Sequence, residues 1–148
     1  MSEGAASTGT AEARTSAQAV RSVVAMIHVK NVEDSASFYR LLGFEIGNFV
    51  PREGTKNWAW LYSPAASDWK IGPNLMLARS SRPLNPEAQD VLFYLYATDL
   101  VGLRNALIAQ GLKPGSITYP EYLPKGEFQI GDPDGYCLMI AQASEDTP

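Results

Sequence analysis

The sequence contains very little cysteine and histidine, and it has no long apolar run. Its 148 residues include one cysteine and one histidine. A single cysteine excludes a disulfide bond within the chain and favours a reducing, cytoplasmic location. No apolar run approaches the roughly 18 residues of a membrane-spanning helix. The first 20 residues also lack the apolar core of a secretory signal. We therefore expect no membrane association.

Positive charge is also scarce. The chain has 12 Lys and Arg against 16 Asp and Glu, which gives a net charge of −4. The charges of residues 1–21 cancel, so the excess negative charge belongs to the remainder of the chain. An acidic domain repels the phosphate backbone, which argues against nucleic-acid binding and favours neutral or cationic ligands.

The overall amino-acid composition is typical of one globular domain. Apolar residues make up 45% of the chain and charged residues 19%, which excludes a largely disordered protein. A chain of this length buries roughly 70% of its extended surface on folding. Residues 1–21 are poor in large apolar groups, so we expect a flexible tail there, a folded domain over 22–142 and a short tail over 143–148.

The order of expected elements occurs twice. In residues 22–79, the pattern predicts a strand, a helix capped by Asn31 and ended by Gly43, and three strands: 23–29, 31–43, 44–50, 58–63 and 74–79. Residues 80–90 are polar, with two prolines, and indicate a linker. Residues 91–142 repeat the order, as 91–97, 98–111, 112–118, 126–131 and 135–142.

A shift of 68 residues relates the two halves, since it places Asn31 on Asp99 and Gly43 on Gly111. Each half is too small to bury its own sheet well. The sequence therefore predicts an α+β fold in which two βαβββ modules form a curved mixed sheet, with helices on one face and a concave cup on the other.

Strand alternation assigns side chains to the two faces. One set is almost purely aliphatic and aromatic, and we assign it to the helix-covered face: Ile27, Val29, Leu75, Leu77, Phe93, Leu95, Leu138 and Ile140. The other mixes aromatic and polar groups, which suits a ligand pocket. The candidate pocket residues are His28, Trp58, Trp60, Asn74, Met76, Leu92, Tyr94, Tyr96, Glu127, Gln129 and Met139.

Three motifs resemble the glyoxalase / bleomycin-resistance / extradiol-dioxygenase (vicinal oxygen chelate) superfamily. They are SFYRLLGFE at 37–45, TDLVGLRNALIAQGL at 98–112 and GEFQIGDPDGY at 126–136. The resemblance covers residues 22–142 and implies the fold described above. It does not imply one reaction, because this scaffold carries several chemistries.

Metalloenzymes of this superfamily hold a divalent ion with His, Glu or Gln on four strands. Carried over by motif, these positions are Val24, Met76, Leu92 and Met139. Hydrocarbon and thioether groups are not ligands for a catalytic divalent ion, and two scattered methionines are more typical of a pocket lining than of a copper(I) site. The resemblance therefore implies neither a metal nor another cofactor, and we assign no catalytic residue.

Without a metal site, the chain is most similar to the bleomycin-resistance branch, in the LLGF end of the first helix and in KGEFQIGDPDGY. The resemblance implies a homodimer that sequesters a drug, in clefts between the first module of one chain and the second module of its partner. The expected role is thus small-molecule binding, in antibiotic resistance.

Individual pocket residues have alternative roles. His28 is either a hydrogen-bonded part of the pocket wall or a ligand contact, and Glu127 either holds a neighbouring group or contacts ligand. The tryptophans and tyrosines either fill the sheet surface or form a stacking cage for a flat or cationic ligand. Trp69 and residues 119–126 lie in loops that can overhang the cup. No neighbouring basic residue activates Cys137, which we expect to be an inert thiol.

Three other functions remain open. The first is a metal-free lyase or isomerase of the same fold that uses Glu127, His28 or a tyrosine. The second is a metal-dependent lyase or dioxygenase with ligands at positions that the family does not use. The third is a structural or regulatory partner domain.

Overall fold

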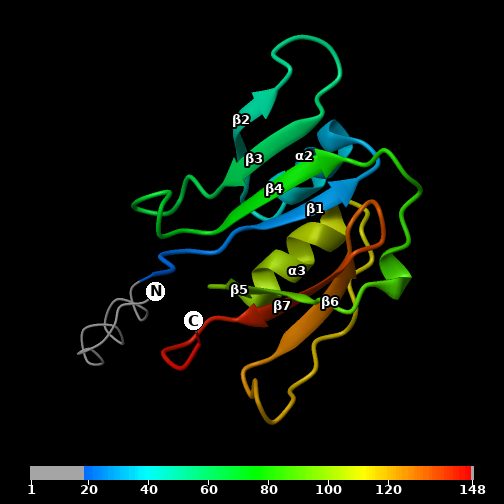
Figure 1. Cartoon of the computed structure of the whole chain (residues 1–148). Coiled ribbons are helices and arrows are strands. Elements are labelled where there is room, and N and C mark those ends of the chain that lie inside the picture. Colours follow the sequence, from blue (N-terminus) through cyan, green and yellow to red (C-terminus); the bar gives the residue numbers. More distant parts are fainter. Residues whose placement is uncertain (1–18, 148) are drawn as a thin grey trace, which may run out of the picture.

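The computed structural model describes residues 19–147, which form two modules with the same order of elements (Figure 1). The first module comprises β1 (Ala25–Val29), α2 (Val32–Arg40), β2 (Glu45–Val50), β3 (Trp58–Tyr62) and β4 (Asn74–Arg79). The second comprises β5 (Phe93–Ala97), α3 (Leu100–Ala109), β6 (Glu127–Gly131) and β7 (Cys137–Gln142), after a linker with the 3-10 turn η1 (Pro86–Ala88). The predicted α+β duplication is confirmed. Most of the predicted tail 1–21 lies outside the described residues.

Each module forms its own sheet. The strand order is β1-β4-β3-β2 in the first and β5-β7-β6 in the second. β1 pairs in parallel with β4, and β5 pairs in parallel with β7. Within the described chain, the predicted curved sheet is thus divided into two, and β1 and β5 are both edge strands.

The second sheet has one strand fewer than the sequence pattern predicted. The predicted strand over 112–118 is wrong: this segment forms a single bridge, between Thr118 and Glu127. Pro114 has no backbone N–H to donate to a ladder. Gly115 donates instead to the carbonyl of Gln129 and accepts from the Arg104 side chain, at 2.8 and 2.7 Å. The segment therefore follows β6 as an irregular strap.

The helix boundaries agree with the predicted caps. The side chains of Asn31 and Asp99 accept hydrogen bonds from the backbone N–H groups of Asp34 and Gly102. Gly43 and Gly111 have φ values of 96° and 86°, in the left-handed region that stops a helix. Within residues 19–147, no helix is long and apolar enough to cross a membrane.

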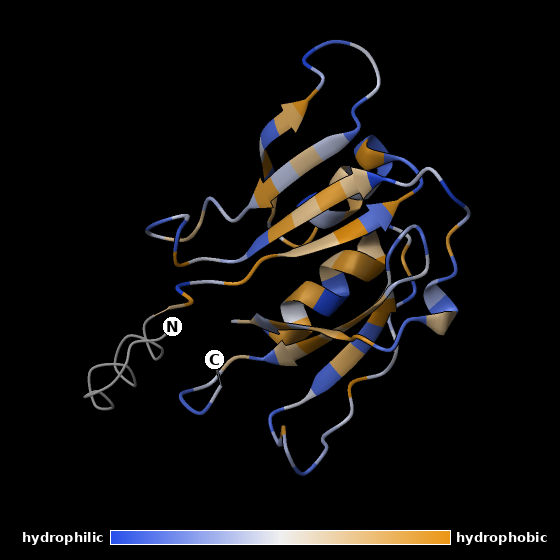
Figure 2. Ribbon diagram, viewed as in Figure 1, coloured by the Kyte–Doolittle hydropathy of each residue, from blue (hydrophilic) through white to orange (hydrophobic). Residues whose placement is uncertain are grey.

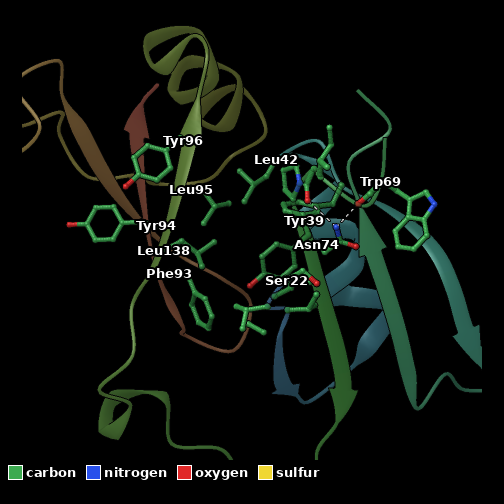
Figure 3. A pocket seen from close by; sticks show the side chains of 18 of the residues that line it. Ser22, Tyr39, Leu42, Trp69, Asn74, Phe93, Tyr94, Leu95, Tyr96 and Leu138 are labelled. Atoms are coloured by element: carbon green, nitrogen blue, oxygen red, sulfur yellow. Dashed lines mark hydrogen bonds between the residues drawn. The ribbon is translucent and has the colours of Figure 1, made fainter. Parts of the chain in front are cut away.

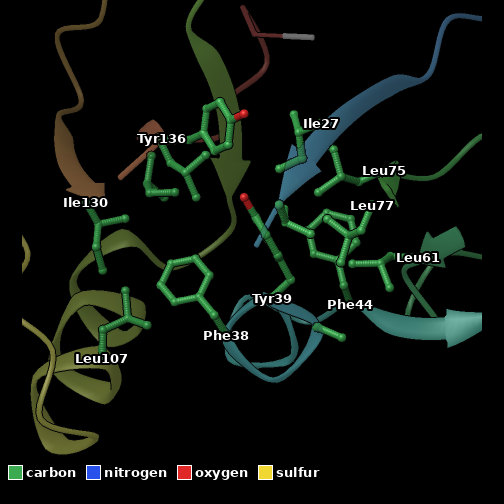
Figure 4. Packing of buried hydrophobic residues seen from close by; sticks show 14 of the residues in the cluster. Ile27, Phe38, Tyr39, Phe44, Leu61, Leu75, Leu77, Leu107, Ile130 and Tyr136 are labelled. Carbon is green, nitrogen blue, oxygen red and sulfur yellow. The ribbon is translucent and has the colours of Figure 1, made fainter. Parts of the chain in front are cut away.

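One apolar core fills the space between the two sheets. Both helices lie on these inner sides, and α3 is largely apolar (Figures 1 and 2). Of the predicted inward set, Ile27, Val29, Leu75, Leu77, Leu138 and Ile140 are buried, and Phe93 and Leu95 are half-buried. In Figure 4, Phe38 of α2 packs beside Ile130 and Leu107 of the second module. The modules are thus joined by a shared interior.

A polar clamp also joins the modules, at the turn between β6 and β7. The hydroxyl of Tyr39 donates to Oδ2 of buried Asp132 at 2.8 Å. Oδ1 of the same carboxyl accepts from the backbone N–H groups of Asp134 and Tyr136, and the Tyr136 hydroxyl donates to the carbonyl of His28. Burial raises the pKa of Asp132, although these hydrogen bonds act in the opposite direction. This turn of the second module is therefore held against α2 and β1 of the first.

Candidate functional site

The outward face of the first module is a row of aromatic and thioether side chains. The strand register places Trp60 beside Met76 and Met76 beside Met26. The next row contains His28, Ala78 and Trp58. Ala59 and Leu61, which alternate with the tryptophans, are buried on the opposite side. The structure therefore places the predicted residues of this module on one face, directed away from the core.

Hydrogen bonds hold the Trp69 loop over this face. Trp60 stacks on Tyr62 with ring centroids 5.2 Å apart, and the edge of Trp69 meets Trp60 at 5.3 Å. Nε1 of Trp60 donates to Oδ1 of Asn74, whose Nδ2 donates to the carbonyls of Trp69 and Gly72 at 2.8 and 2.9 Å. Asn74 thus holds the Trp60 ring and the Trp69 loop together at one end of this face.

This packing explains a glycine in β2. A Cβ atom at Gly47 would overlap the ring of Trp60. We expect Gly47→Ala to lower the free energy of unfolding by about 1–3 kcal/mol and to shift the tryptophan fluorescence, because the ring must move. A denaturant titration measures both. Gly131→Ala is the matched control in β6, because its Cβ would have nothing within 4 Å. Equal stability of the two variants would contradict the packing.

The outward face of the second module is a row of tyrosines beside a buried acid. The register aligns Glu127, Ala141 and Tyr96 in one row, and Gln129, Met139 and Tyr94 in the next. The rings of Tyr94 and Tyr96 are stacked, with centroids 6.4 Å apart. A hollow of about 350 Å³ lies over this face. Its lining residues are Tyr94, Tyr96, Tyr122, Leu123, Pro124, Lys125, Gln142, Ser144, Asp146 and Thr147.

A chain of hydroxyl groups connects this hollow to Glu127. The Tyr122 hydroxyl donates to Oε2 of Glu127 at 3.2 Å and lies 3.3 Å from the Tyr94 hydroxyl. The hydrogen bond to Tyr122 raises the pKa of Tyr94, and burial and the negative charge of Glu127 add to this shift. Glu127 itself is only 5% exposed. Tyr94 is therefore a protonated hydrogen-bonding group at neutral pH.

Sequence patterns missed part of this hollow. Tyr122 was not singled out, although its loop, 119–126, was expected to overhang the cup. Residues 143–148 were expected to form a tail, yet Ser144, Asp146 and Thr147 line the hollow. The tyrosines and proline of the loop were the available signal. Nothing in the composition of residues 143–148 indicates that they line a ligand site.

A larger cavity lies elsewhere, between the two modules. It has a volume of about 810 Å³, and residues 21–25 and 69–75 line it together with inward-facing apolar side chains. In Figure 3, Phe93 and Leu95 point toward the first module, whereas Tyr94 points the other way. Of the candidate pocket residues, only Asn74, Tyr94 and Tyr96 line this cavity. The structure divides the remainder between the two outward faces.

The four positions that correspond to metal ligands remain hydrocarbon and thioether groups in the structure. Val24 and Leu92 are 38% and 52% exposed beside the edge strands, and Met76 and Met139 are half-buried on the two faces. Among residues 19–147, no three His, Cys, Asp or Glu side chains lie close enough together to hold a metal ion. The oxygen and imidazole donors that a divalent ion requires do not converge at these four positions, so their side chains do not fit a catalytic divalent ion.

Two other candidate groups have no catalytic arrangement within one chain. His28 lies on the outward face of the first sheet and Glu127 on that of the second, and no hydrogen bond or salt bridge joins them among residues 19–147. Burial raises the pKa of the Cys137 thiol, which keeps it protonated at neutral pH. The chemistry that the two faces offer is ring stacking, hydrogen bonding and one buried negative charge.

Several solved structures share this fold. A bleomycin-binding protein complexed with bleomycin is 20% identical, with a TM-score of 0.62 over 84% of this chain and 100% of that chain. A bleomycin resistance determinant encoded on the transposon Tn5 is 19% identical, with a TM-score of 0.63 over 84% and 99% of the two chains. A glyoxylase/bleomycin resistance protein/dioxygenase domain from Frankia sp. EAN1pec is 18% identical, with a TM-score of 0.60 over 85% and 93%.

No family model matches the chain, and no curated protein matches it in sequence. The structural likeness confirms the predicted fold, which this chain shares with a bleomycin-binding protein and a glyoxylase/bleomycin resistance protein/dioxygenase domain.

Proposed function

We propose that two copies of this chain form a metal-free receptor that binds a small aromatic or cationic molecule in a shared cup. One observation carries the proposal: the two aromatic faces point away from each other, because the helices and the shared core lie between the sheets (Figures 1 and 3). Within one chain the core separates Trp60 from Tyr94, so one drug-sized ligand does not stack on both rings. It can contact both if the first module of one copy meets the second module of another.

The edges of the sheets support this assembly. β1 and β5 have no strand partner on one side. Exposed apolar side chains lie beside them: Val23, Val24 and Met26 next to β1, and Val91 and Leu92 next to β5. Unpaired strands with exposed apolar groups are typical of sites of association. Joining β1 of one copy to β5 of another would cover these groups and place Trp60 and Tyr94 in one cup.

Similar proteins support a role in drug sequestration. One structure with this fold is a bleomycin-binding protein complexed with bleomycin, and another is a bleomycin resistance determinant. The acidic charge and the aromatic faces of this chain are compatible with a cationic, flat drug. We therefore propose cytoplasmic sequestration of such a molecule, in antibiotic resistance.

Bleomycin titration tests the proposal directly. The three tryptophans of the chain, Trp58, Trp60 and Trp69, all belong to the first module, so intrinsic fluorescence reports on its face. We expect a dimer by light scattering at micromolar concentration, with a saturable fluorescence change on addition of bleomycin. Native mass spectrometry of the purified protein tests for another bound small molecule.

Removal of divalent metals is the control. Dialysis against EDTA is expected to leave ligand binding unchanged, because the corresponding positions carry no oxygen or imidazole donors. Elemental analysis of the purified protein checks the same point. A monomer, or binding that requires a stoichiometric divalent ion, would contradict the proposal.

A further inference from the structure

Half of the proposed cup already exists in a single chain. The hollow over the second module has two stacked tyrosines, Tyr94 and Tyr96, on one side and Tyr122 on another. Stacked phenol rings bind flat or cationic groups through their faces. A subsite on this module therefore does not need the partner copy in order to form.

Glu127 is a buried carboxylate with too few hydrogen bonds. It is only 5% exposed, and its Oε1 atom is buried with no hydrogen-bond partner. Its Oε2 atom accepts one hydrogen bond, from the Tyr122 hydroxyl at 3.2 Å. The two salt bridges among residues 19–147 are Arg40–Glu45 and Lys56–Glu33, so neither involves this group. A buried carboxylate without a cation is costly for the folded protein and favours binding of a compensating donor.

Tyr122 separates this carboxylate from the hollow. The side chain lines the hollow, donates to Glu127 and is 68% exposed. An exposed ring in a loop can move aside with little loss of packing. Lys125 and Asp146 also line the hollow, and their opposite charges offset each other. Glu127 therefore gives this end of the face a net negative charge.

We infer that Glu127 recognises a ligand cation that carries N–H groups, such as an amidinium, a guanidinium or a protonated amine next to a flat ring. The cation donates to Oε1, and the ring packs against Tyr94 and Tyr96. A quaternary ammonium group fits less well, because it has no N–H to give the unpartnered oxygen. This inference rests on the proposed function, since the hollow is one half of the proposed cup.

Three probes of similar shape separate charge from hydrogen bonding. Benzamidinium has both positive charge and N–H donors, benzamide has donors without charge, and phenyltrimethylammonium has charge without donors. In NMR titrations of ¹⁵N-labelled protein, we expect benzamidinium to bind at least about tenfold more tightly than either of the others. The shifted amide signals are expected to include Tyr94, Tyr122 and Glu127.

A matched pair of variants assigns the effect to one carboxylate. Glu127→Gln is expected to weaken benzamidinium binding at least about tenfold. Glu87→Gln removes the same charge from an exposed residue of the linker, and we expect binding within about twofold of the unmodified chain. If Glu127→Gln does not fold, the order of the three probes on the unmodified protein still decides the question.

The inference and the proposed function fail in different ways. Equal affinity for benzamidinium and benzamide, or equal effects of the two variants, would overturn the inference. Bleomycin binding by a dimer that shows no amidinium preference would leave the proposed function intact. Amidinium selectivity in a strictly monomeric protein would contradict the shared cup and support the subsite.

Discussion

Replacing Asp132 by alanine is expected to lower the free energy of unfolding by about 3–4 kcal/mol. The variant loses three hydrogen bonds at once and leaves the buried hydroxyl of Tyr39 without a partner. In a domain of this size, such a loss corresponds to a fall in Tm of roughly 10 °C. The effect is expected to be large because the carboxyl joins the two modules. Urea titration followed by circular dichroism measures it.

Two variants separate the clamp from a general effect of charge. Asp90→Ala removes the same group from an exposed position in the linker and is expected to change stability by less than about 0.5 kcal/mol. Tyr39→Phe removes only the hydroxyl, so its cost is expected to lie between those of the two alanine variants. Similar stabilities for Asp132→Ala and Asp90→Ala would show that the clamp does not join the modules.

Mixing two inactive variants is expected to restore ligand binding. Trp60→Ala damages the face of the first module, and Tyr96→Ala damages the face of the second. In the proposed assembly, a dimer of two identical variant chains has two damaged cups. A mixed dimer has one cup with both changes and one cup with neither. Random assortment during co-expression therefore restores about a quarter of the cups.

Titration with bleomycin measures the number of binding sites in the co-expressed protein. Refolding the two variants separately and combining them without subunit exchange is the control, and we expect no binding there. If both faces served one cup within a single chain, co-expression would restore nothing. The stoichiometry thus distinguishes a shared cup from a site contained in one chain.

Short-range patterns predicted most of the elements. Asn31 and Asp99 began the helices and Gly43 and Gly111 ended them, because caps and left-handed stops depend on neighbouring residues. The failed prediction, the strand over 112–118, had an alternating pattern but contained a proline. Whether a strand forms depends on a hydrogen-bonding neighbour, and Arg104 and Gln129 compete for the backbone of this segment.

The candidate site was predictable only in part. Alternation assigned Trp60, Met76, Tyr94 and Glu127 to the sheet face opposite the apolar set, which agrees with the strand register because the side-chain period of a strand is a local property. It could not show that these faces belong to two sheets that point apart. It also could not show that Oε1 of Glu127 has no partner, since this depends on Tyr122 and on a loop that covers the carboxyl.

The sequence by itself determined the duplicated order of elements, the inward apolar set and the lack of metal-binding groups at the four positions, since each depends on residue type and spacing along the chain. Only the tertiary structure decided the direction of the two aromatic faces and the isolation of the Glu127 carboxylate. Both depend on how the helices and loops fill the space between and over the sheets. Packing of that kind joins residues far apart in the chain, and no local pattern records it.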